Sequence, residues 1–263
     1  MLGAIIGDIV GSRFEWNNHR DKNFNFFDKN CFFTDDSIMT LAIGKALLDC
    51  KGDYSSLSEK TVQCMQKVGR PYPYSGYGGM FMEWMYSDEP KPYGSFGNGS
   101  AMRVSACGYV AKTIEQVKDL SHKVTVVTHN HPEGLKGAEA TAMAIFLARN
   151  GYPIDYIRNY INDNYYKLDF TLNQIRDTYR FNETCQQTVP QAIEAFLEST
   201  SFEDAVRNAI SIGGDSDTLA SITGGIAQAY YGIDKGIREQ GISYLDRPLK
   251  KILLDFEKTF SII

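Results

Sequence analysis

The feature that most constrains the fold is a pair of segments that are apolar on nearly every face of a helix, residues 36–49 and 217–231. A helix without a polar face belongs among other helices rather than at a surface. The apolar side chains are Ile38, Met39, Leu41, Ala42, Ile43, Ala46, Leu47 and Leu48 in the first segment, and Leu219, Ala220, Ile222, Ile226, Ala227 and Ala229 in the second. These segments predict a helical bundle with both at its centre.

The other apolar stretches have the length of helices, which favours an all-α, compact bundle forming a single domain over residues 1–263. The KVTVVTH stretch at 123–129 alternates as a strand does, but we do not assign it to a strand. Gly7 and Gly11 lie one helical turn apart and predict close helix packing. The predicted helices cover 2–13, 36–49, 56–68, 98–110, 114–127, 134–149, 153–162, 189–198, 202–212, 217–231 and 246–259.

Charge and cysteine content narrow the functional classes. The formal net charge is −5, which disfavours a surface that follows a nucleic-acid backbone. The five cysteines show no CxxC spacing and indicate thiols in a reducing compartment. The apolar start lacks a basic leader, and no stretch approaches the roughly 20 apolar residues of a membrane span. We expect a cytoplasmic protein without a membrane segment or nucleic-acid partner.

Both central segments begin with acidic clusters, Thr34-Asp35-Asp36 and Asp215-Ser216-Asp217-Thr218. Either cluster alone is explained by helix capping and the helix dipole. Capping does not require two carboxylates in each cluster, and a buried charge must be paired or bind a metal. The basic residues nearby in sequence are only Lys29, Lys45 and Arg207. Oxygen ligands of this kind suit Mg²⁺ or Mn²⁺ better than zinc, and two ions about 3.5–4 Å apart could be held.

A glycine-rich block, YGSFGNGSAMR at 93–103, precedes a predicted helix. Glycines allow backbone N–H groups to approach a phosphate at a helix N-terminus, and Phe96 or Tyr93 could stack on a base. A simple turn capped by Asn98 or Ser100 explains the block equally well.

Three further polar groups are candidates. His129 and His131 could bind zinc together with Glu133, although contact of one histidine with a ribose hydroxyl or a loop carbonyl, and a structural role for the other, is the better interpretation. Asp8 is expected to be a structural hydrogen-bond acceptor. Glu15, between Phe14 and Trp16, is either exposed or a partly enclosed carboxylate able to act on water.

Five blocks taken in order resemble the ADP-ribosylglycohydrolase family: GAIIGDIVGSRFE, FTDDSIMTLAIGKAL, GSFGNGSAMRVSACG, THNHPEGLKGAEATA and GGDSDTLASITGGI. The resemblance implies an all-α bundle with a dinuclear Mg²⁺ or Mn²⁺ cleft. The implied metal ligands are Thr34, Asp35, Asp36, Asp215, Asp217 and Thr218. The implied substrate-binding residues are Ser95, Gly97, Asn98 and Gly99 for pyrophosphate and ribose, Phe96 for adenine, and His129. Glu15, Asp35 and Asp36 are the candidate catalytic carboxylates.

The resemblance also implies the reaction, which is release of ADP-ribose from a modified protein side chain, with arginine favoured over serine as the acceptor. The expected partners are the ADP-ribosylated protein and ADP-ribose, and the chain is expected to act as a monomer. Two alternatives remain: a non-catalytic module that binds ADP-ribose or a partner protein, and a hydrolase of a free ADP-ribosyl metabolite or modified nucleic acid. Segments 51–92 and 150–188 match no block and are expected to determine the acceptor.

Overall fold

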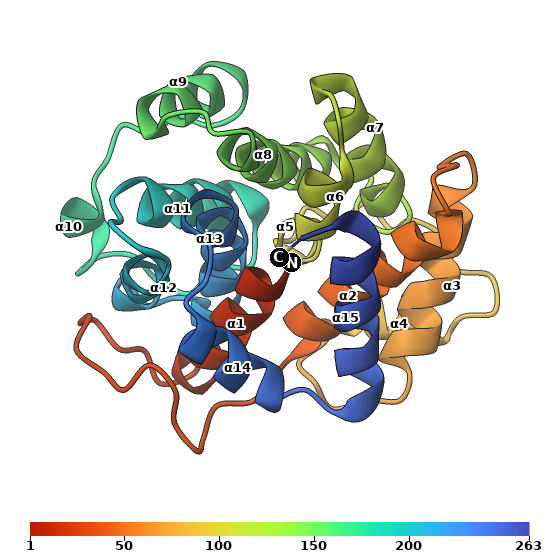
Figure 1. The fold of residues 1–263 in the computed structure, drawn as a ribbon, viewed down its shortest axis with the longest axis horizontal. Coiled ribbons are helices and arrows are strands. Elements are labelled where there is room, and N and C mark those ends of the chain that lie inside the picture. Colours follow the sequence, from red (N-terminus) through yellow and green to blue (C-terminus); the bar gives the residue numbers. More distant parts are fainter. Residues whose placement is uncertain (263) are drawn as a thin grey trace.

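Helix α1 (Leu2–Gly11) lies in the middle of the molecule, between α13 (Ser216–Tyr231) and α2 (Asp35–Cys50) (Figure 1). The structure, a computed structural model, describes residues 1–262, and over these residues the regular elements are all helices. The fold class predicted from the sequence is therefore confirmed. The remaining elements are η1 (Ser12–Phe14), α3 (Leu57–Gly69), α4 (Gly79–Tyr86), α5 (Gly99–Met102), α6 (Ser105–Val110), α7 (Ile114–Thr125), α8 (Pro132–Arg149), α9 (Ile154–Asn164), α10 (Leu172–Ile175), α11 (Cys185–Leu197), α12 (Phe202–Ser211), α14 (Lys235–Ser243) and α15 (Arg247–Phe260).

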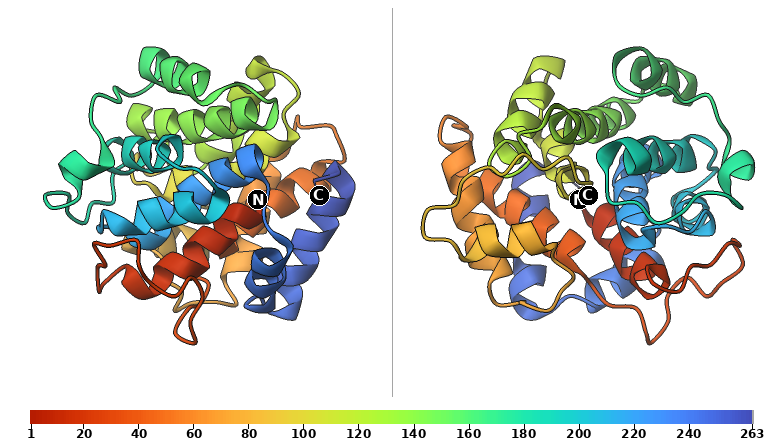
Figure 2. Two further views of the ribbon diagram at one scale, coloured as in Figure 1. Left: turned by 60° about the vertical axis from the view of Figure 1, so that its left-hand side comes forward. Right: turned by 180° about the vertical axis from the view of Figure 1, so that it is seen from behind.

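Glycines on one face of α1 allow its backbone to touch that of α13, and both views in Figure 2 show the two helices side by side. A Cβ atom at Gly7 would lie 1.9 Å from the carbonyl oxygen of Ala220, and one at Gly3 would lie 2.2 Å from that of Gly224. Any larger residue would separate the helices, because real side chains do not approach so closely. The predicted close packing at Gly7 and Gly11 is confirmed.

Several predicted boundaries were wrong. The helix expected over 98–110 is divided into α5 and α6, because Arg103 and Val104 have ψ angles of −7° and −4°, outside the range that continues an α-helix. Helix α11 begins at Cys185 rather than at 189 and contains Pro190 in its interior. Helices α4, α10 and α14 were not predicted. Residues 126–128 form a turn after α7, so rejection of the strand at 123–129 is confirmed.

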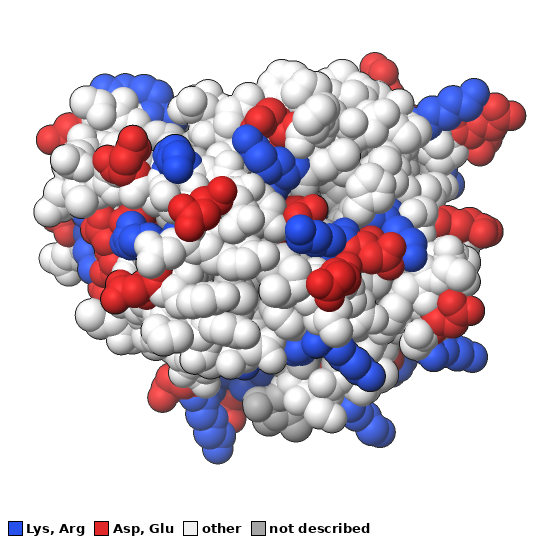
Figure 3. Space-filling view, turned by 90° about the horizontal axis from the view of Figure 1, so that it is seen from above, with Lys and Arg blue, Asp and Glu red and all other residues white. Residues whose placement is uncertain are grey.

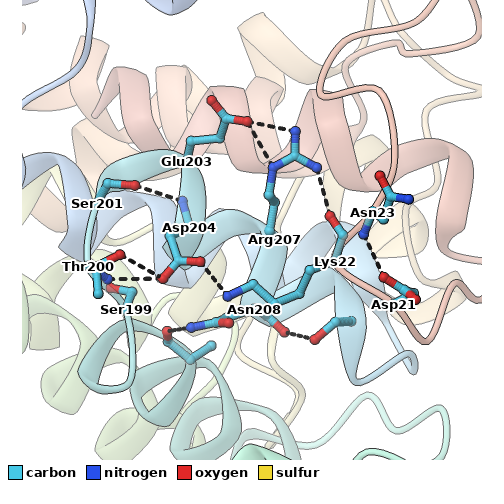
Figure 4. Close-up of polar contacts among 12 residues, drawn as sticks. Asp21, Lys22, Asn23, Ser199, Thr200, Ser201, Glu203, Asp204, Arg207 and Asn208 are labelled. Atoms are coloured by element: carbon cyan, nitrogen blue, oxygen red, sulfur yellow. Dashed lines mark hydrogen bonds and ion pairs between the residues drawn. The ribbon is translucent and has the colours of Figure 1, made fainter.

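The long loop between α1 and α2 is held against α12 (Figure 4). Arg207 donates hydrogen bonds from Nη1 to the carbonyl oxygens of Lys22 and Phe24, at 2.8 and 2.7 Å. The Arg207 guanidinium also pairs with Glu203, and the Lys22 ammonium pairs with Asp204. These contacts fix the path of the chain from Glu15, at the end of η1, to the start of α2.

Six of the ten ion pairs within residues 1–262 join side chains three or four positions apart on one helix. Figure 3 shows Lys and Arg side chains beside Asp and Glu side chains on the upper face of the molecule. Lys123 and Asp119 lie 2.8 Å apart, as do Lys251 and Asp255, each pair one helical turn apart. Within residues 1–262, no helix combines the length and the apolar character needed to cross a bilayer.

Candidate active site

The N-termini of α2 and α13 meet at one end of the central helices and bring the two acidic clusters together. Thr34 is the N-cap of α2, and its hydroxyl oxygen accepts the N–H of Asp36 at 3.3 Å. Asp215 is the N-cap of α13 and Asp217 lies in its first turn. The two helices are joined directly, because the hydroxyl of Thr218 donates to Oδ2 of Asp36 at 3.2 Å. Carboxylates at these positions also complement the helix dipoles.

Asp8 fixes the start of α2 from within α1. Its carboxylate accepts the N–H and the hydroxyl of Thr34, at 2.9 and 2.7 Å, the N–H of Ser37 at 3.0 Å, and the hydroxyl of Ser37. Burial raises the pKa of Asp8 to about 6, while these hydrogen bonds act in the opposite direction. The predicted role of Asp8 as a structural acceptor is thus confirmed, and α1 positions both acidic helices.

Glu15 joins the carboxylates of α13. One carboxylate oxygen each of Glu15, Asp215 and Asp217 lie within 4.8 Å of one another, although Glu15 comes from the opposite end of the chain. Glu15 is half-buried. Burial raises its pKa to about 7, and the charges of Asp215 and Asp8 add to this effect. The structure therefore places Glu15 in the enclosed position rather than the exposed one.

The carboxylates of the site lack basic partners. Burial, together with the mutual repulsion of the cluster, raises the pKa values of Asp35, Asp36 and Asp217 well above their ordinary value. In the part of the chain that the structure describes, no basic side chain forms an ion pair with these residues, with Glu15 or with Asp215. Oδ1 of Asp36 is buried without any hydrogen-bond partner.

This donor set fits divalent cations. Lys45 and Arg207, two of the basic residues near the clusters in sequence, are paired elsewhere with Asp49 and Glu203. Buried carboxylates without counter-charges are destabilising unless a cation or protons neutralise them. Carboxylate and hydroxyl oxygens are the ligands that Mg²⁺ and Mn²⁺ prefer.

The glycine-rich block forms a turn that contacts the cluster. Asn98 donates its backbone N–H to the carbonyl oxygen of Glu183 at 2.7 Å, and its side-chain Nδ2 to Oδ2 of Asp215 at 2.7 Å. The N–H of Gly97 donates to the hydroxyl of Ser95 at 3.2 Å. The backbone donors of Gly97 and Asn98 are therefore already used. Those of Ser95, Phe96 and Gly99 have no hydrogen-bond acceptor within residues 1–262.

A cleft of about 610 Å³ opens between the acidic cluster and this turn, a volume typical of a site for a nucleotide-sized ligand. Of the residues predicted from the sequence, Glu15, Asp35, Asp36, Ser95, Phe96, Gly97, Asn98, Gly99, His129, Asp215, Asp217 and Thr218 line it. Thr34 does not line the cleft, because its hydroxyl is turned towards Asp8. His131 caps α8 by accepting the N–H of Glu133 and is structural.

Among the lining residues that the sequence analysis missed are Gly76, Arg103, Phe181 and Glu183. Arg103 is only 1% exposed, and within residues 1–262 it forms no ion pair with a carboxylate. Phe181 and Glu183 belong to segment 150–188, which was expected to determine the acceptor. Gly76 has φ +99°, and a Cβ there would lie 2.8 Å from Oδ1 of Asp35. For these residues, the only sign of a role in the cleft that the sequence offered was the position of Arg103 inside the glycine-rich block.

The chain is similar to known proteins over almost its whole length. The family model described as ADP-ribosylglycohydrolase matches residues 1–258. Human ADP-ribosylhydrolase ARH3 is 23% identical, over 89% of this chain and 85% of the relative. The mouse protein of the same name is 25% identical, over 89% and 83%. A solved structure titled "ADP-ribosylglycohydrolase-related protein complex" superimposes with a TM-score of 0.66 at 18% identity, covering 98% of this chain and 97% of that one, which shows a shared fold.

The family match spans nearly the whole chain, and the relatives are matched over most of their own length. Each of the five sequence blocks contributes residues to the acidic cleft or to the packing that builds it. The chain is therefore a member of the ADP-ribosylglycohydrolase family and a hydrolase that acts on ADP-ribose glycosidic bonds.

Proposed function

We propose that this protein removes ADP-ribose from a modified protein side chain and depends on two divalent cations, Mg²⁺ or Mn²⁺, to do so. The observation that carries the proposal is the group of buried carboxylates that have no basic partner and line a cleft beside a glycine-rich turn. Such a group is stable at neutral pH only if cations or protons neutralise it. A binding module without chemistry would have no need for this arrangement.

The residues that would hold the cations are Thr34, Asp35, Asp36, Asp215, Asp217 and Thr218. When bound, the cations would act as Lewis acids towards the ribose hydroxyls and the reacting centre. Thr218 already joins the two helices through Asp36, so the ligands of α2 and α13 are fixed relative to each other before any cation binds. Thr34 does not line the cleft, so to serve as a ligand its hydroxyl would offer an oxygen lone pair to a cation while still donating its proton to Asp8.

Glu15 is the carboxylate that we assign as proton acceptor, in preference to Asp35 and Asp36. Glu15 lines the cleft, where an attacking water could reach it, and burial with the neighbouring carboxylates favours its uptake of a proton by raising its pKa. Glu15 is half-buried, whereas Asp36 is almost inaccessible. The oxygen of the attacking water would bond to the ribose anomeric carbon while its proton passes to the Glu15 carboxylate, and the bond from that carbon to the acceptor would break. The departing acceptor atom would take a proton from Glu15 or from solvent.

The glycine-rich turn would bind the pyrophosphate. Its free N–H groups at Ser95, Phe96 and Gly99 are suited to anionic oxygens, and the adjoining N-terminus of α5 favours negative charge. The ring of Phe96, 43% exposed, is available to stack on adenine. His129 lies on the same side of the cleft, and burial lowers its pKa well below the ordinary value, so it would act as a neutral donor.

The acceptor is the least determined part of the reaction. The sequence-based preference for arginine finds no support among the relatives, whose names specify no acceptor. The test is release of free ADP-ribose from serine-modified and arginine-modified peptides, each with Mg²⁺ and with a chelator, using Asp217→Ala as the matched inactive variant. Release from one peptide that stops with the chelator supports the proposal and identifies the acceptor.

Equal release with and without the chelator would overturn the role of the cations. Tight binding of ADP-ribose without release from either peptide would overturn the protein substrate. In that case a free ADP-ribosyl metabolite becomes the substrate to test.

A further inference from the structure

A buried arginine lines the cleft and has a single polar partner among the residues that the structure describes. Arg103 donates a hydrogen bond from Nη2 to the hydroxyl oxygen of Thr128 at 2.6 Å. Its Nε has no partner within residues 1–262, and its guanidinium lies 5.9 Å from the ring centroid of Phe81. Burial lowers the pKa of Arg103 to about 10, so the side chain remains positively charged at neutral pH. Because the Arg103 guanidinium donates to the hydroxyl oxygen of Thr128, it influences which acceptor receives the hydroxyl proton.

The hydroxyl of Thr128 has one proton and two acceptor sites. A guanidinium can only donate, so one acceptor site is occupied by Arg103. Two partners remain for the hydroxyl: Nδ1 of His129 at 2.7 Å, and the carbonyl oxygen of Thr125 at 3.5 Å. The shorter contact is the stronger one for the single proton. The positive charge of Arg103 also polarises the hydroxyl and makes it a better donor.

Nδ1 of His129 then accepts a hydrogen bond, and in a neutral imidazole the proton must lie on Nε2. Nε2 faces the glycine-rich turn, because a Cβ at Gly97 or Gly99 would lie 3.6 or 3.5 Å from it. In the residues that the structure describes, Nε2 makes no hydrogen bond to the protein. The ring therefore presents an unused N–H to the side of the cleft where the turn would bind an anion.

We propose that Arg103 and Thr128 are positioning residues, which hold His129 as the neutral tautomer protonated on Nε2 and so fix a hydrogen-bond donor towards the bound ADP-ribose. Thr128 does not line the cleft, so it acts on a bound ligand only through His129. The tautomer itself is a property of the free protein, whereas its use in binding ADP-ribose rests on the proposed function. Substitution of Thr128 by serine keeps the hydroxyl, and substitution by valine keeps the shape but removes it.

The experiment is long-range ¹H–¹⁵N NMR of the imidazole nitrogens at pH 7.5 in the full-length protein, in which His19, His122, His129 and His131 are the only histidines. The imidazole signals that disappear in the His129→Gln variant are those of His129. The same samples are titrated with ADP-ribose. We expect wild type and Thr128→Ser to show Nε2 protonated and Nδ1 unprotonated. Thr128→Val should show mixed tautomers and about tenfold weaker binding of ADP-ribose, the loss of roughly one well-aligned hydrogen bond.

Two results would overturn the inference. One is a wild-type His129 protonated on Nδ1, a result that needs no variant and holds whether or not the protein is a hydrolase. The other is a Thr128→Val protein whose His129 nitrogens and ADP-ribose affinity equal those of Thr128→Ser. A failure to release ADP-ribose from modified peptides would instead contradict the proposed function and leave the tautomer assignment in place.

Discussion

The side-chain amide of Asn98 donates a hydrogen bond from Nδ2 to Oδ2 of Asp215 at 2.7 Å, and so connects the glycine-rich turn to the acidic cluster. The backbone N–H of Asn98 is also occupied, by the carbonyl oxygen of Glu183. Both donors of this residue therefore point into the protein. The sequence indicates a substrate ligand at this position, whereas the contacts favour a residue that orients an implied metal ligand.

The first prediction follows from this contact. Asn98→Ala should raise the Mg²⁺ concentration needed for half-maximal activity by about 10- to 100-fold, because residues that orient metal ligands typically have effects of that size. The measurement is the rate of ADP-ribose release against Mg²⁺ concentration. Phe96→Leu, in the same turn, is the control and should raise the KM for substrate without changing the Mg²⁺ dependence. If Asn98→Ala behaves like Phe96→Leu, Asn98 acts on the substrate instead.

The second prediction concerns Asp8. Asp8→Asn should destabilise the fold by about 3 kcal/mol, because an amide cannot accept all the hydrogen bonds from Thr34 and Ser37, and at least one buried N–H loses its partner. The measurement is urea unfolding of the chelated protein. An unfolding free energy equal to that of wild type would show that Asp8 does not hold the start of α2.

The third prediction is that Asp36→Asn, in contrast to Asp8→Asn, lowers activity without lowering stability. In the chelated protein its stability should equal or exceed that of wild type, because burial and the charges of Asp8 and Asp35 disfavour the Asp36 carboxylate. Activity with Mg²⁺ should fall by about a thousandfold, since loss of a cation ligand removes several kcal/mol of transition-state stabilisation. A variant that is folded and as active as wild type would contradict the assignment of Asp36 as a metal ligand.

The central helices and both acidic clusters could be predicted from the sequence because their signals are local. An all-apolar helix and a run of carboxylates can each be recognised within about sixteen residues, as in α2. Their meeting point could not be derived in this way. It depends on the close contact of α1 with α13 and on Asp8 reaching the start of α2, which are tertiary contacts. The order of the five sequence blocks resembles that of the ADP-ribosylglycohydrolase family, and this resemblance indicated that the two acidic clusters share one site.

Arg103 illustrates what the sequence conceals. An arginine in a polar, glycine-rich block is expected at the surface, yet this one is buried, and its only polar partner in the described part of the chain is a hydroxyl. The short helices α4 and α14 were missed because glycine, proline and tyrosine are frequent in or beside them, and weak local preference is overridden by packing on the core. Such features depend on neighbours distant in sequence.

The fourth testable consequence concerns two adjacent glycines of α13. Gly224→Ala should destabilise the protein by about 3 kcal/mol, because the new Cβ would lie 2.2 Å from the carbonyl oxygen of Gly3 and force α1 away. Gly225→Ala is the matched control. Its Cβ would meet Ile145 at 3.4 Å, an ordinary contact, so the helix preference of alanine should leave stability unchanged or raise it by up to about 1 kcal/mol. Thermal unfolding of both variants is the measurement, and equal effects would contradict the close contact of α1 with α13.

The last prediction concerns pH and cations together. Without cations, burial and neighbouring charges raise the pKa of Glu15 from 4.5 to about 7, and burial raises that of Asp8 to about 6. The folded chain then binds more protons than the unfolded chain. These extra protons stabilise the folded chain. Their contribution to the free energy of unfolding is complete below about pH 4 and is lost as the pH rises through about 7. In chelator, the contribution of the cluster should therefore make Tm fall between pH 5.5 and 7.5.

Saturating Mg²⁺ should reverse this trend, because cations bind the deprotonated carboxylates and the gain in Tm on adding Mg²⁺ should grow with pH. Glu15→Gln isolates the cluster from other titrating groups, and its Tm in chelator should depend less on pH than that of wild type. The measurement is thermal unfolding of both proteins at pH 5.5 and 7.5, with Mg²⁺ and with chelator. A gain from Mg²⁺ that is the same at both pH values would show that protons and cations do not compete for these carboxylates, and the cation site would then have to be sought elsewhere.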